Sequence, residues 1–276
     1  MKELNKNEET VAQHYNSVAF EYEQQRLATS ASVEFAITVR YLQHYIPAGA
    51  RVAELGVGGG QYTEVLARQG CWLHLVDVSQ RLLDATVARL QMSGLFTHIL
   101  DSQHASATYL PHLETACCDV VVCLGPLYHL CNPTDRQQTV REVARILQPG
   151  GWLYAAGINR LAYLRDAWRS RPHQGAEQRA FRTQFLRDGN LDPLRAPQVG
   201  HAHLSTSDEF RDLFRDSFDE VILVGVESFT AGGQEVFPTL SAENANAWLH
   251  LVEQTGKTPD GLGISDHFLY IGRKRA

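Results

Sequence analysis

The segment Gly56-Val-Gly58-Gly-Gly60 has the residue types and the spacing of a site for a nucleotide-type cofactor. Glycine tolerates positive φ angles and allows the backbone to approach a ligand closely. The apolar residues 52–55 before the glycines predict a buried strand, and a helix is expected to begin at about Gln61. The free N–H groups and positive dipole at the start of such a helix favour a polar or anionic part of a ligand.

Acidic residues are expected at or near the ends of three successive strands, at Glu54, Asp77 and Asp101. Asp77 follows Gly56 by 21 positions, close to the ~20-residue offset at which a carboxylate accepts both hydroxyls of a ribose. Asp101 and the adjacent Ser102 are placed to meet the edge of an adenine. These residues together predict a site for a cofactor that contains a nucleoside.

The segments that must position these residues alternate between strand and helix. Strands are expected over residues 52–55, 73–78, 97–100, 119–124 and 152–158, with helices over 61–69, 79–94 and 135–147. This alternation predicts an α/β protein with a doubly wound parallel sheet, whose ligands bind beyond the carboxyl ends of the strands. Further along the chain, a capping box at 206–209 predicts a helix to 217. A strand over 220–226, a helix over 241–255 and a last strand over 267–273 are expected after it.

Two regions lie outside this alternation. Residues 8–26 are predicted to form one amphipathic helix and residues 30–45 a second, so that residues 1–46 are expected to be N-terminal cap helices. The arginine-rich residues 159–204 are predicted to form a helical lid over the substrate. Residues 47–158 and 205–276 then form the cofactor-binding domain.

At the glycine turn and the strand ends, the sequence resembles the class I S-adenosylmethionine-dependent methyltransferases, in the branch that acts on small molecules. The resemblance covers residues 50–158 strongly and the tail from His203 more loosely, and it departs from the family at Val57 and in a longer gap between Asp101 and Leu110-Pro111. It implies a Rossmann-like seven-stranded sheet with the last strand antiparallel. The matching segments are Glu54-Leu-Gly56-Val-Gly58-Gly-Gly60, Val76-Asp77-Val78-Ser79, Leu100-Asp101-Ser102, Leu124-Gly125-Pro126-Leu127-Tyr128-His129-Leu130 and Leu147-Gln-Pro149-Gly150-Gly151.

By this resemblance the cofactor is S-adenosylmethionine, and each of its parts has expected partners. The methionine part is expected to lie in the glycine turn, and the Leu124 carbonyl is expected to reach its amine. The complete set of cofactor-binding residues is then Glu54, Gly56, Gly58 and Gly60 at the methionine part, Asp77 and Val78 at the ribose, Asp101 and Ser102 at the adenine, Leu124, and Arg26 at the carboxylate.

Transfer of a methyl group from a sulfonium is an in-line displacement that depends on positioning the acceptor and requires no metal. Aromatic faces stabilise a sulfonium charge, and the candidates are Tyr15, Tyr22 and Tyr128. Tyr15 and Tyr22 are expected two turns apart on one helix, with Arg26 one turn further on. His129 is the candidate base for a hydroxyl acceptor, and the alternative is that it only shapes the pocket.

The predicted lid offers two further candidates for substrate contact, Trp168 on its apolar inner face and His203 at its end. The lid carries an excess of four positive charges, from eight arginines and four acidic residues. These charges either select an acceptor with a carboxylate or phosphate, or form a solvated helix face. His201 and His203 have the spacing of two metal ligands on a strand, but no third ligand is evident, so no metal is expected.

The overall composition narrows the possible partners. A net charge of −6 disfavours a nucleic-acid surface. A polar N-terminus and the lack of an apolar stretch of ~18 residues favour a cytoplasmic protein without a membrane partner, as a monomer or homodimer.

The expected function is transfer of a methyl group to an O, N or C atom of a small organic molecule. One alternative is a nicotinamide-dependent oxidoreductase, although Gln61 stands where the last glycine of Gly-x-Gly-x-x-Gly belongs. The other alternative is a protein that binds S-adenosylmethionine without catalysis.

Overall fold

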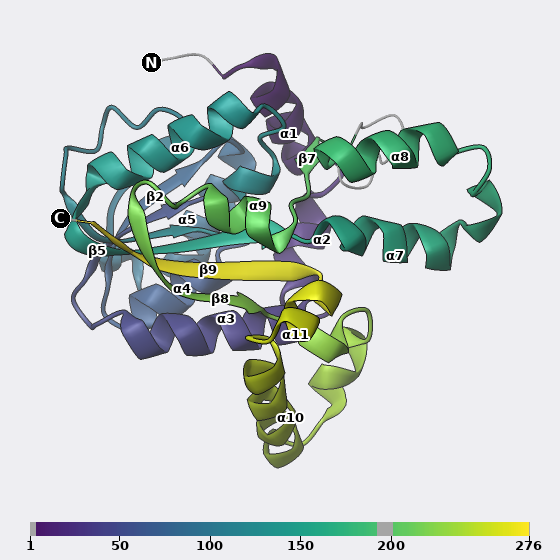
Figure 1. Ribbon diagram of the computed structural model, residues 1–276. Coiled ribbons are helices and arrows are strands. Elements are labelled where there is room, and N and C mark those ends of the chain that lie inside the picture. The colour runs from purple at the N-terminus through teal and green to yellow at the C-terminus, as the bar shows by residue number, and fades with distance from the viewer. Residues whose placement is uncertain (1–3, 192–200, 276) are drawn as a thin grey trace.

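The computed structural model describes residues 4–191 and 201–275 and is built around one central sheet (Figure 1). Seven strands form this sheet in the spatial order β3-β2-β1-β4-β5-β9-β8. Their bounds are β1 (Arg51–Leu55), β2 (Trp72–Asp77), β3 (Ile99–His104), β4 (Cys118–Cys123), β5 (Leu147–Ile158), β8 (Phe218–Gly225) and β9 (His267–Lys274). The first five strands are parallel, whereas β9 is antiparallel to both β5 and β8. The prediction of a doubly wound, seven-stranded sheet with an antiparallel last strand is therefore confirmed.

The order of the strands reverses at β1, which lies between β2 and β4. In open α/β sheets a ligand binds beside such a switch point, outside the carboxyl ends of the strands. The chain leaves β1 at Leu55 and β4 at Cys123, and these two residues are partners in the register. The glycine turn and the segment that begins at Leu124 therefore start side by side.

Helices cover both faces of the sheet, and Figure 1 shows α3 and α6 on opposite sides of it. Successive residues of a strand point to opposite faces. Val52, for example, packs in the hydrophobic cluster under α3, α4 and α5, whereas Ala53 packs in the cluster under α6 and α9. The bounds of these helices are α3 (Ser32–Tyr45), α4 (Gln61–Arg68), α5 (Gln80–Met92), α6 (Pro133–Ile146) and α9 (Ser207–Asp212).

The capping residues of three helices agree with the sequence. Ser79 caps α5 and accepts a hydrogen bond from the N–H of Leu82. Thr206 and Glu209 form the expected capping box at the start of α9, although this helix ends five residues earlier than predicted, at Asp212. Asn132 caps α6, and Pro133 occupies its first turn.

The N-terminal region differs from the prediction because residues 8–26 do not form one helix. They are divided between α1 (Lys6–Asn16) and α2 (Phe20–Arg26). The chain turns at Ser17, whose φ of −131° and ψ of −89° end the first helix. Tyr15 and Tyr22 consequently lie on different helices and do not share a face.

Two groups of helices project from the body in Figure 1. One is a hairpin of α7 (Arg160–Ser170) and α8 (Arg179–Asp188), followed by the small sheet of β6 (Asn190–Leu191) and β7 (Ala202–His203). It falls within the predicted lid, and part of that lid, including Pro193, Arg195 and Pro197, lies outside the described residues. The other group joins β8 to β9 and contains α10 (Ala242–Thr255) and α11 (Pro259–Ile264).

Within residues 4–191 and 201–275, no helix is long and apolar enough to cross a membrane.

Candidate functional site

A cavity, here called the main cavity, lies at the carboxyl ends of β1, β2 and β4 and is covered by α1 and α2. Its walls come from the glycine turn, the end of β2, the loop after β3, the segment after β4 and the two N-terminal helices. Nine of the predicted site residues line it, namely Tyr15, Arg26, Gly56, Gly58, Asp77, Val78, Leu124, Tyr128 and His129. The switch point of the sheet thus brings most of the predicted residues together.

Glycine is required at three positions of the turn. Gly56, Gly58 and Gly60 have φ angles of 80°, 55° and 77°, a region that residues with a Cβ rarely adopt. A Cβ on Gly56 would lie 2.8 Å from the Cδ of Pro126, and a Cβ on Gly60 would lie 2.8 Å from the Oγ1 of Thr86. Gly60 does not line the main cavity. Because it has no Cβ, the start of α4 can pack closely against Thr86 of α5.

Asp77 is the buried carboxylate at the end of β2. One of its oxygens accepts a hydrogen bond from the N–H of Ser79 at 2.8 Å and the other from the N–H of Gly58 at 3.3 Å. Burial raises the pKa of Asp77 to about 6, although the two N–H groups oppose the shift. A carboxylate fixed in this way has lone pairs left for the hydroxyls of a ribose.

Glu54 is buried two residues before Gly56 but does not line the main cavity. Its Oε2 has no hydrogen-bond partner, and burial raises its pKa to about 8. A buried acceptor without a donor is costly. Because Glu54 lies outside the cavity wall, its contact with the methionine part of the cofactor stays a prediction.

The structure corrects the predicted end of β3, which continues to His104 instead of ending at residue 100, so that Asp101 and Ser102 lie within the strand. Asp101 lies opposite His74 of β2 and contacts its Nδ1 at 2.7 Å. Neither Asp101 nor Ser102 lines the main cavity. Ala105, Ser106 and Ala107 form that wall instead.

Tyr15 and His129 form a hydrogen-bonded pair in the cavity wall. The Nδ1 of His129 lies 2.9 Å from the carbonyl oxygen of His201, and its Nε2 lies 2.9 Å from the Tyr15 hydroxyl. A carbonyl can only accept, so Nδ1 carries the proton and, in the neutral ring, Nε2 accepts from Tyr15. Burial lowers the pKa of His129 to about 4, which favours this neutral form, and raises that of Tyr15 well above 10.

This arrangement changes the role expected of His129. Both of its nitrogens are engaged, so it cannot accept a proton directly from a bound hydroxyl without displacing Tyr15. Tyr15 lines the cavity beside His129. Tyr128 lines the cavity too, and its hydroxyl donates to the Leu124 carbonyl at 3.0 Å.

Tyr22, predicted to face the cofactor, does not line the main cavity. Its side chain is 58% exposed, and its hydroxyl contacts Ser30 at 3.1 Å. The break between α1 and α2 turns it away from the cavity. Arg26, by contrast, lines the cavity and pairs with Glu23 and Glu34.

The two candidates from the predicted lid also lie outside the main cavity. Trp168 is 75% exposed, because Tyr163 and Ala167, four residues apart, form the buried face of α7. His203 is buried and lines a second cavity with Arg136 and Arg160, and its Nδ1 contacts the Asn190 side chain at 2.9 Å. Burial lowers the pKa of His203 to about 4.

Sequence reasoning missed two acidic residues of the cavity wall, Glu8 and Glu23. Glu8 forms a capping box with Asn5, and this Asn-x-x-Glu pattern at the start of α1 is a signal that sequence reasoning can use. Glu8 also accepts a short hydrogen bond from Ser106. Nothing in the local sequence distinguishes Glu23 from the other polar residues of α2.

Comparison with known proteins agrees with the fold. Residues 53–155 match the family described as "Methyltransferase domain". Together with the sheet order and the glycine turn, this match confirms the resemblance noted in the sequence over residues 53–155.

Relatives in sequence are similar to less than half of the chain. The chain is 37% identical over 114 residues to the ubiquinone biosynthesis O-methyltransferase of Xanthomonas oryzae pv. oryzae (strain PXO99A), a match that covers 41% of this chain and 45% of that protein. It is 30% identical over 125 residues to the ubiquinone biosynthesis O-methyltransferase of Albidiferax ferrireducens, with 45% and 48% covered. The chain thus spans less than half the length of these curated relatives.

Solved structures are similar over nearly the whole chain but at low identity. The N-methyltransferase NodS from Bradyrhizobium japonicum WM9, in complex with S-adenosyl-L-homocysteine, has a TM-score of 0.59 at 17% identity, with 95% of this chain and 99% of that chain covered. A possible histamine N-methyltransferase from Thermotoga maritima has a TM-score of 0.55 at 18% identity, with 96% and 99% covered. These likenesses establish the fold.

Proposed function

We propose that this protein is an S-adenosylmethionine-dependent methyltransferase that methylates an oxygen atom of a small organic molecule. The observation that carries the proposal is the meeting of Asp77, the glycine turn and the Tyr15–His129 pair in one cavity at the switch point of the sheet. The names of the sequence relatives favour oxygen over nitrogen or carbon as the acceptor atom.

The residues of the main cavity suit the separate parts of the cofactor. Asp77 would accept from the ribose hydroxyls, and the backbone of Gly56 and Gly58 would lie against the amino-acid part. Ser106, rather than Ser102, lies on the wall after β3, where the base is expected. Arg26 would face the carboxylate. When bound here, S-adenosylmethionine supplies a methyl group on a positively charged sulfur, ready for in-line displacement.

Tyr15 and His129 would handle the proton of a hydroxyl acceptor. The Tyr15 oxygen is placed to accept a hydrogen bond from the acceptor, because its own proton points to Nε2 of His129. Proton transfer from the acceptor to Tyr15, with the Tyr15 proton passing to Nε2, would leave His129 charged and the Tyr15 hydroxyl restored. Since the pKa of His129 is lowered to about 4, this transfer requires the acceptor oxygen to become strongly acidic, as it does once it carries the methyl group.

Several finer points belong to the same proposal. Residues 159–204 are proposed to border the acceptor pocket, with His203 and the second cavity on its far side, and residues 1–46 to cover the cofactor. The protein is proposed to act in the cytoplasm, as a monomer or homodimer, without nucleic acid or membrane as a partner. Because the match to the family ends at residue 155, residues 156–276 are where specificity for the acceptor would be determined.

The experiment that tests this proposal supplies the protein with S-adenosylmethionine labelled in its methyl group and a panel of phenols, catechols and amines. Mass spectrometry of the products would report which atoms gain the label. We expect label on a phenolic or catecholic oxygen. Label only on nitrogen would contradict the acceptor atom, and binding of the cofactor without turnover on any acceptor would favour a non-catalytic binding protein.

A further inference from the structure

A line of five charged side chains runs from the main cavity to the start of β9. We call it the charge chain, and its members are Glu23, Arg26, Glu34, His267 and Glu227. The Nε of Arg26 contacts Glu23 at 3.2 Å, and its Nη1 contacts Glu34 at 2.7 Å. The Nδ1 of His267 lies 3.6 Å from the same Oε2 of Glu34 and 2.5 Å from Oε1 of Glu227. The charge chain thus connects α2, α3, the end of β8 and β9.

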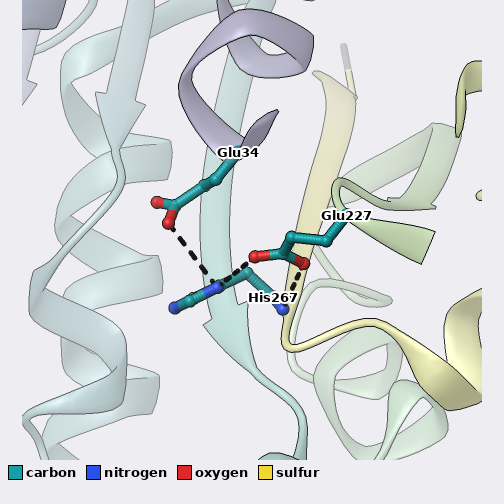
Figure 2. A group of neighbouring side chains, drawn as sticks. All are labelled: Glu34, Glu227 and His267. Carbon is teal, nitrogen blue, oxygen red and sulfur yellow. Dashed lines mark hydrogen bonds and ion pairs between the residues drawn. The ribbon is translucent and has the colours of Figure 1, made fainter. Parts of the chain in front are cut away.

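The inner end of the charge chain is rigidly fixed. Glu227 is fully buried, and its Oε2 accepts from the Ser265 hydroxyl at 2.6 Å and from the backbone N–H groups of Asp266 and His267 at 3.1 Å and 2.8 Å. Figure 2 shows the His267 ring reaching from this carboxylate toward Glu34, with Nδ1 between the two. Oε2 already accepts three hydrogen bonds, and Nδ1 of His267 lies 2.5 Å from Oε1, so we assign the proton of this contact to Nδ1, which donates to Glu227.

The described groups that face the His267 ring are mostly acidic, and the one cation among them, Arg26, opposes the charged form of the ring. They are Glu34 from α3, Glu227 after β8, Arg26 and Glu23 from α2, and the neutral Tyr62 of α4, which lines the same small hollow. Burial alone would lower the pKa of His267, but Glu34 and Glu227 outweigh it and raise this pKa to about 9. The ring is therefore an imidazolium near neutral pH.

Arg26, near the main cavity, has N–H groups that neither Glu23 nor Glu34 engages. Among the described residues, Arg26 uses its Nε and one N–H of Nη1, and its Nη2 has no hydrogen-bond partner. Arg26 is also the one arginine or lysine in the cavity wall formed by described residues. Glu23 and Glu34 both contact Arg26. Glu34 is shared with a second cation, His267, whose closer partner is Glu227, so His267 offsets part of the negative charge that Glu34 places on Arg26.

A metal ion is the other occupant that this geometry suggests, since ligand atoms of Glu34, Glu227 and His267 lie within 4.8 Å of one another. However, the Nδ1 that would bind the ion is the atom already bonded to Glu227, and Arg26 occupies the oxygen of Glu34. A metal would displace both contacts and place its charge beside Arg26. The contacts fit a protonated histidine better.

We propose that protonated His267 is a positioning residue, which neutralises Glu34 and so leaves Arg26 free to bind the carboxylate of S-adenosylmethionine or S-adenosylhomocysteine. This inference rests on the proposed function. It adds a residue on β9 that never touches the cofactor but controls its affinity through Glu34 and Arg26.

The test measures the dissociation constant of S-adenosylhomocysteine by calorimetry in the intact protein between about pH 7 and about pH 10. Loss of the His267 proton, with a midpoint near pH 9, is expected to weaken binding roughly three- to tenfold, the size expected for one charge beside a partly buried ion pair. H267Q is expected to show the weakened affinity already at neutral pH. E227Q removes the stronger partner of the imidazolium, so the midpoint should move to lower pH.

Two controls isolate this effect. H74Q removes a similar histidine–carboxylate contact, 2.7 Å from Asp101 and outside the main cavity, and should bind as the wild type does at every pH. The ligand's own amine titrates in all variants, so the difference between wild type and H267Q is the quantity that counts. An analogue of S-adenosylhomocysteine without its carboxylate should show no difference between these two proteins.

The possible failures are distinguishable. Equal affinity of folded H267Q and wild type throughout the pH range would overturn the role of His267 and leave the proposed function intact. A metal ion found in stoichiometric amount in the purified protein, whose removal weakens the binding of S-adenosylhomocysteine, would overturn the role of His267 in favour of a metal site. No binding of S-adenosylhomocysteine by the wild type at any pH would overturn the proposed function and this inference with it.

Discussion

Three side chains from three elements bring available polar groups into the main cavity. Asp77 ends β2, Tyr15 lies near the end of α1, and Arg26 ends α2. Each is held by a partner that fixes its direction, namely the N–H groups of Gly58 and Ser79, the Nε2 of His129, and the two glutamates. Polar groups fixed before the ligand arrives need little reorganisation during the reaction.

Tyr15→Phe removes one oxygen atom and tests whether the Tyr15 hydroxyl passes the proton of the acceptor to His129. Removing the hydroxyl keeps the ring but breaks the link between the acceptor and His129, so kcat should fall about a hundredfold, the lower end of the range for loss of an acid–base group. Affinity for S-adenosylhomocysteine should hardly change. Tyr22→Phe removes the exposed hydroxyl at Ser30 and serves as the matched control, with activity like that of the wild type.

Gly56→Ala tests the close approach of backbone that the glycine turn requires. Gly49 has the same φ of 80° but nothing within 4 Å of the position that a Cβ would take, whereas a Cβ on Gly56 would collide with Pro126. Gly49→Ala should therefore cost only the left-handed strain, about 1–2 kcal/mol of unfolding free energy. Gly56→Ala should cost a further ~1–3 kcal/mol from overpacking. Equal losses in denaturant titrations would contradict this account.

Site residues whose role depends on neighbours in the chain could be predicted from the sequence. Site residues whose role depends on distant parts of the chain could not. Gly56, Gly58 and Asp77 are recognisable because the turn and the strand end that need them are close in the chain. The charge chain joins residues 23–34 to residues 227 and 267, and no local pattern relates such distant positions. His129 was found by its position after β4, but its tautomer depends on a carbonyl 72 residues away.

At the level of elements, strongly apolar strands were predicted well and polar ones poorly. β4, with the sequence Cys-Asp-Val-Val-Val-Cys, is buried along most of its length, so its bounds follow from hydrophobicity. β3 is an edge strand of the sheet, and its residues alternate between half-buried and exposed. Its last four residues were therefore not predicted to be part of the strand. The break after α1 carries no glycine or proline, so the sequence gives no sign of it.

Trp168→Ala tests the position of the helical hairpin. The side chain is 75% exposed on α7, so its removal should change the unfolding free energy by less than about 0.5 kcal/mol, as for most surface substitutions. Affinity for S-adenosylhomocysteine should be unchanged. A large loss of cofactor affinity or stability would mean that the hairpin folds against the body in solution and would restore the predicted inward role of Trp168.

At the scale of the whole molecule, segments from both ends of the chain close over the edge of the sheet. The helices α1 to α3 come from the N-terminal region, and Glu227 and His267 flank the projecting α10 and α11. Ser32 and the backbone N–H groups of Val33 and Glu34 also bond to Gln234 in the connection between β8 and β9. These contacts therefore stabilise the fold and also position the residues of the cofactor site.

His267 makes this shared stability depend on pH. Its pKa is about 9 in the folded protein against an ordinary value of 6.5, so the protonated folded form is favoured. The contribution is complete below about pH 6.5 and is lost as the pH rises through 9, with a size of about 3 kcal/mol. Denaturant titrations should show the wild type losing stability relative to H267Q over this range. Parallel curves for the two proteins would contradict the assignment.

The central claim is that the main cavity binds S-adenosylmethionine through Asp77, and calorimetry with S-adenosylhomocysteine tests it most directly. We predict binding to the wild type that weakens as the pH falls below 6, where Asp77 takes up a proton. Asp77→Ala should weaken binding roughly tenfold to a hundredfold, as expected for lost hydrogen bonds to a charged group. Absence of binding by the folded wild type, or equal binding by the folded Asp77→Ala protein, would contradict the claim.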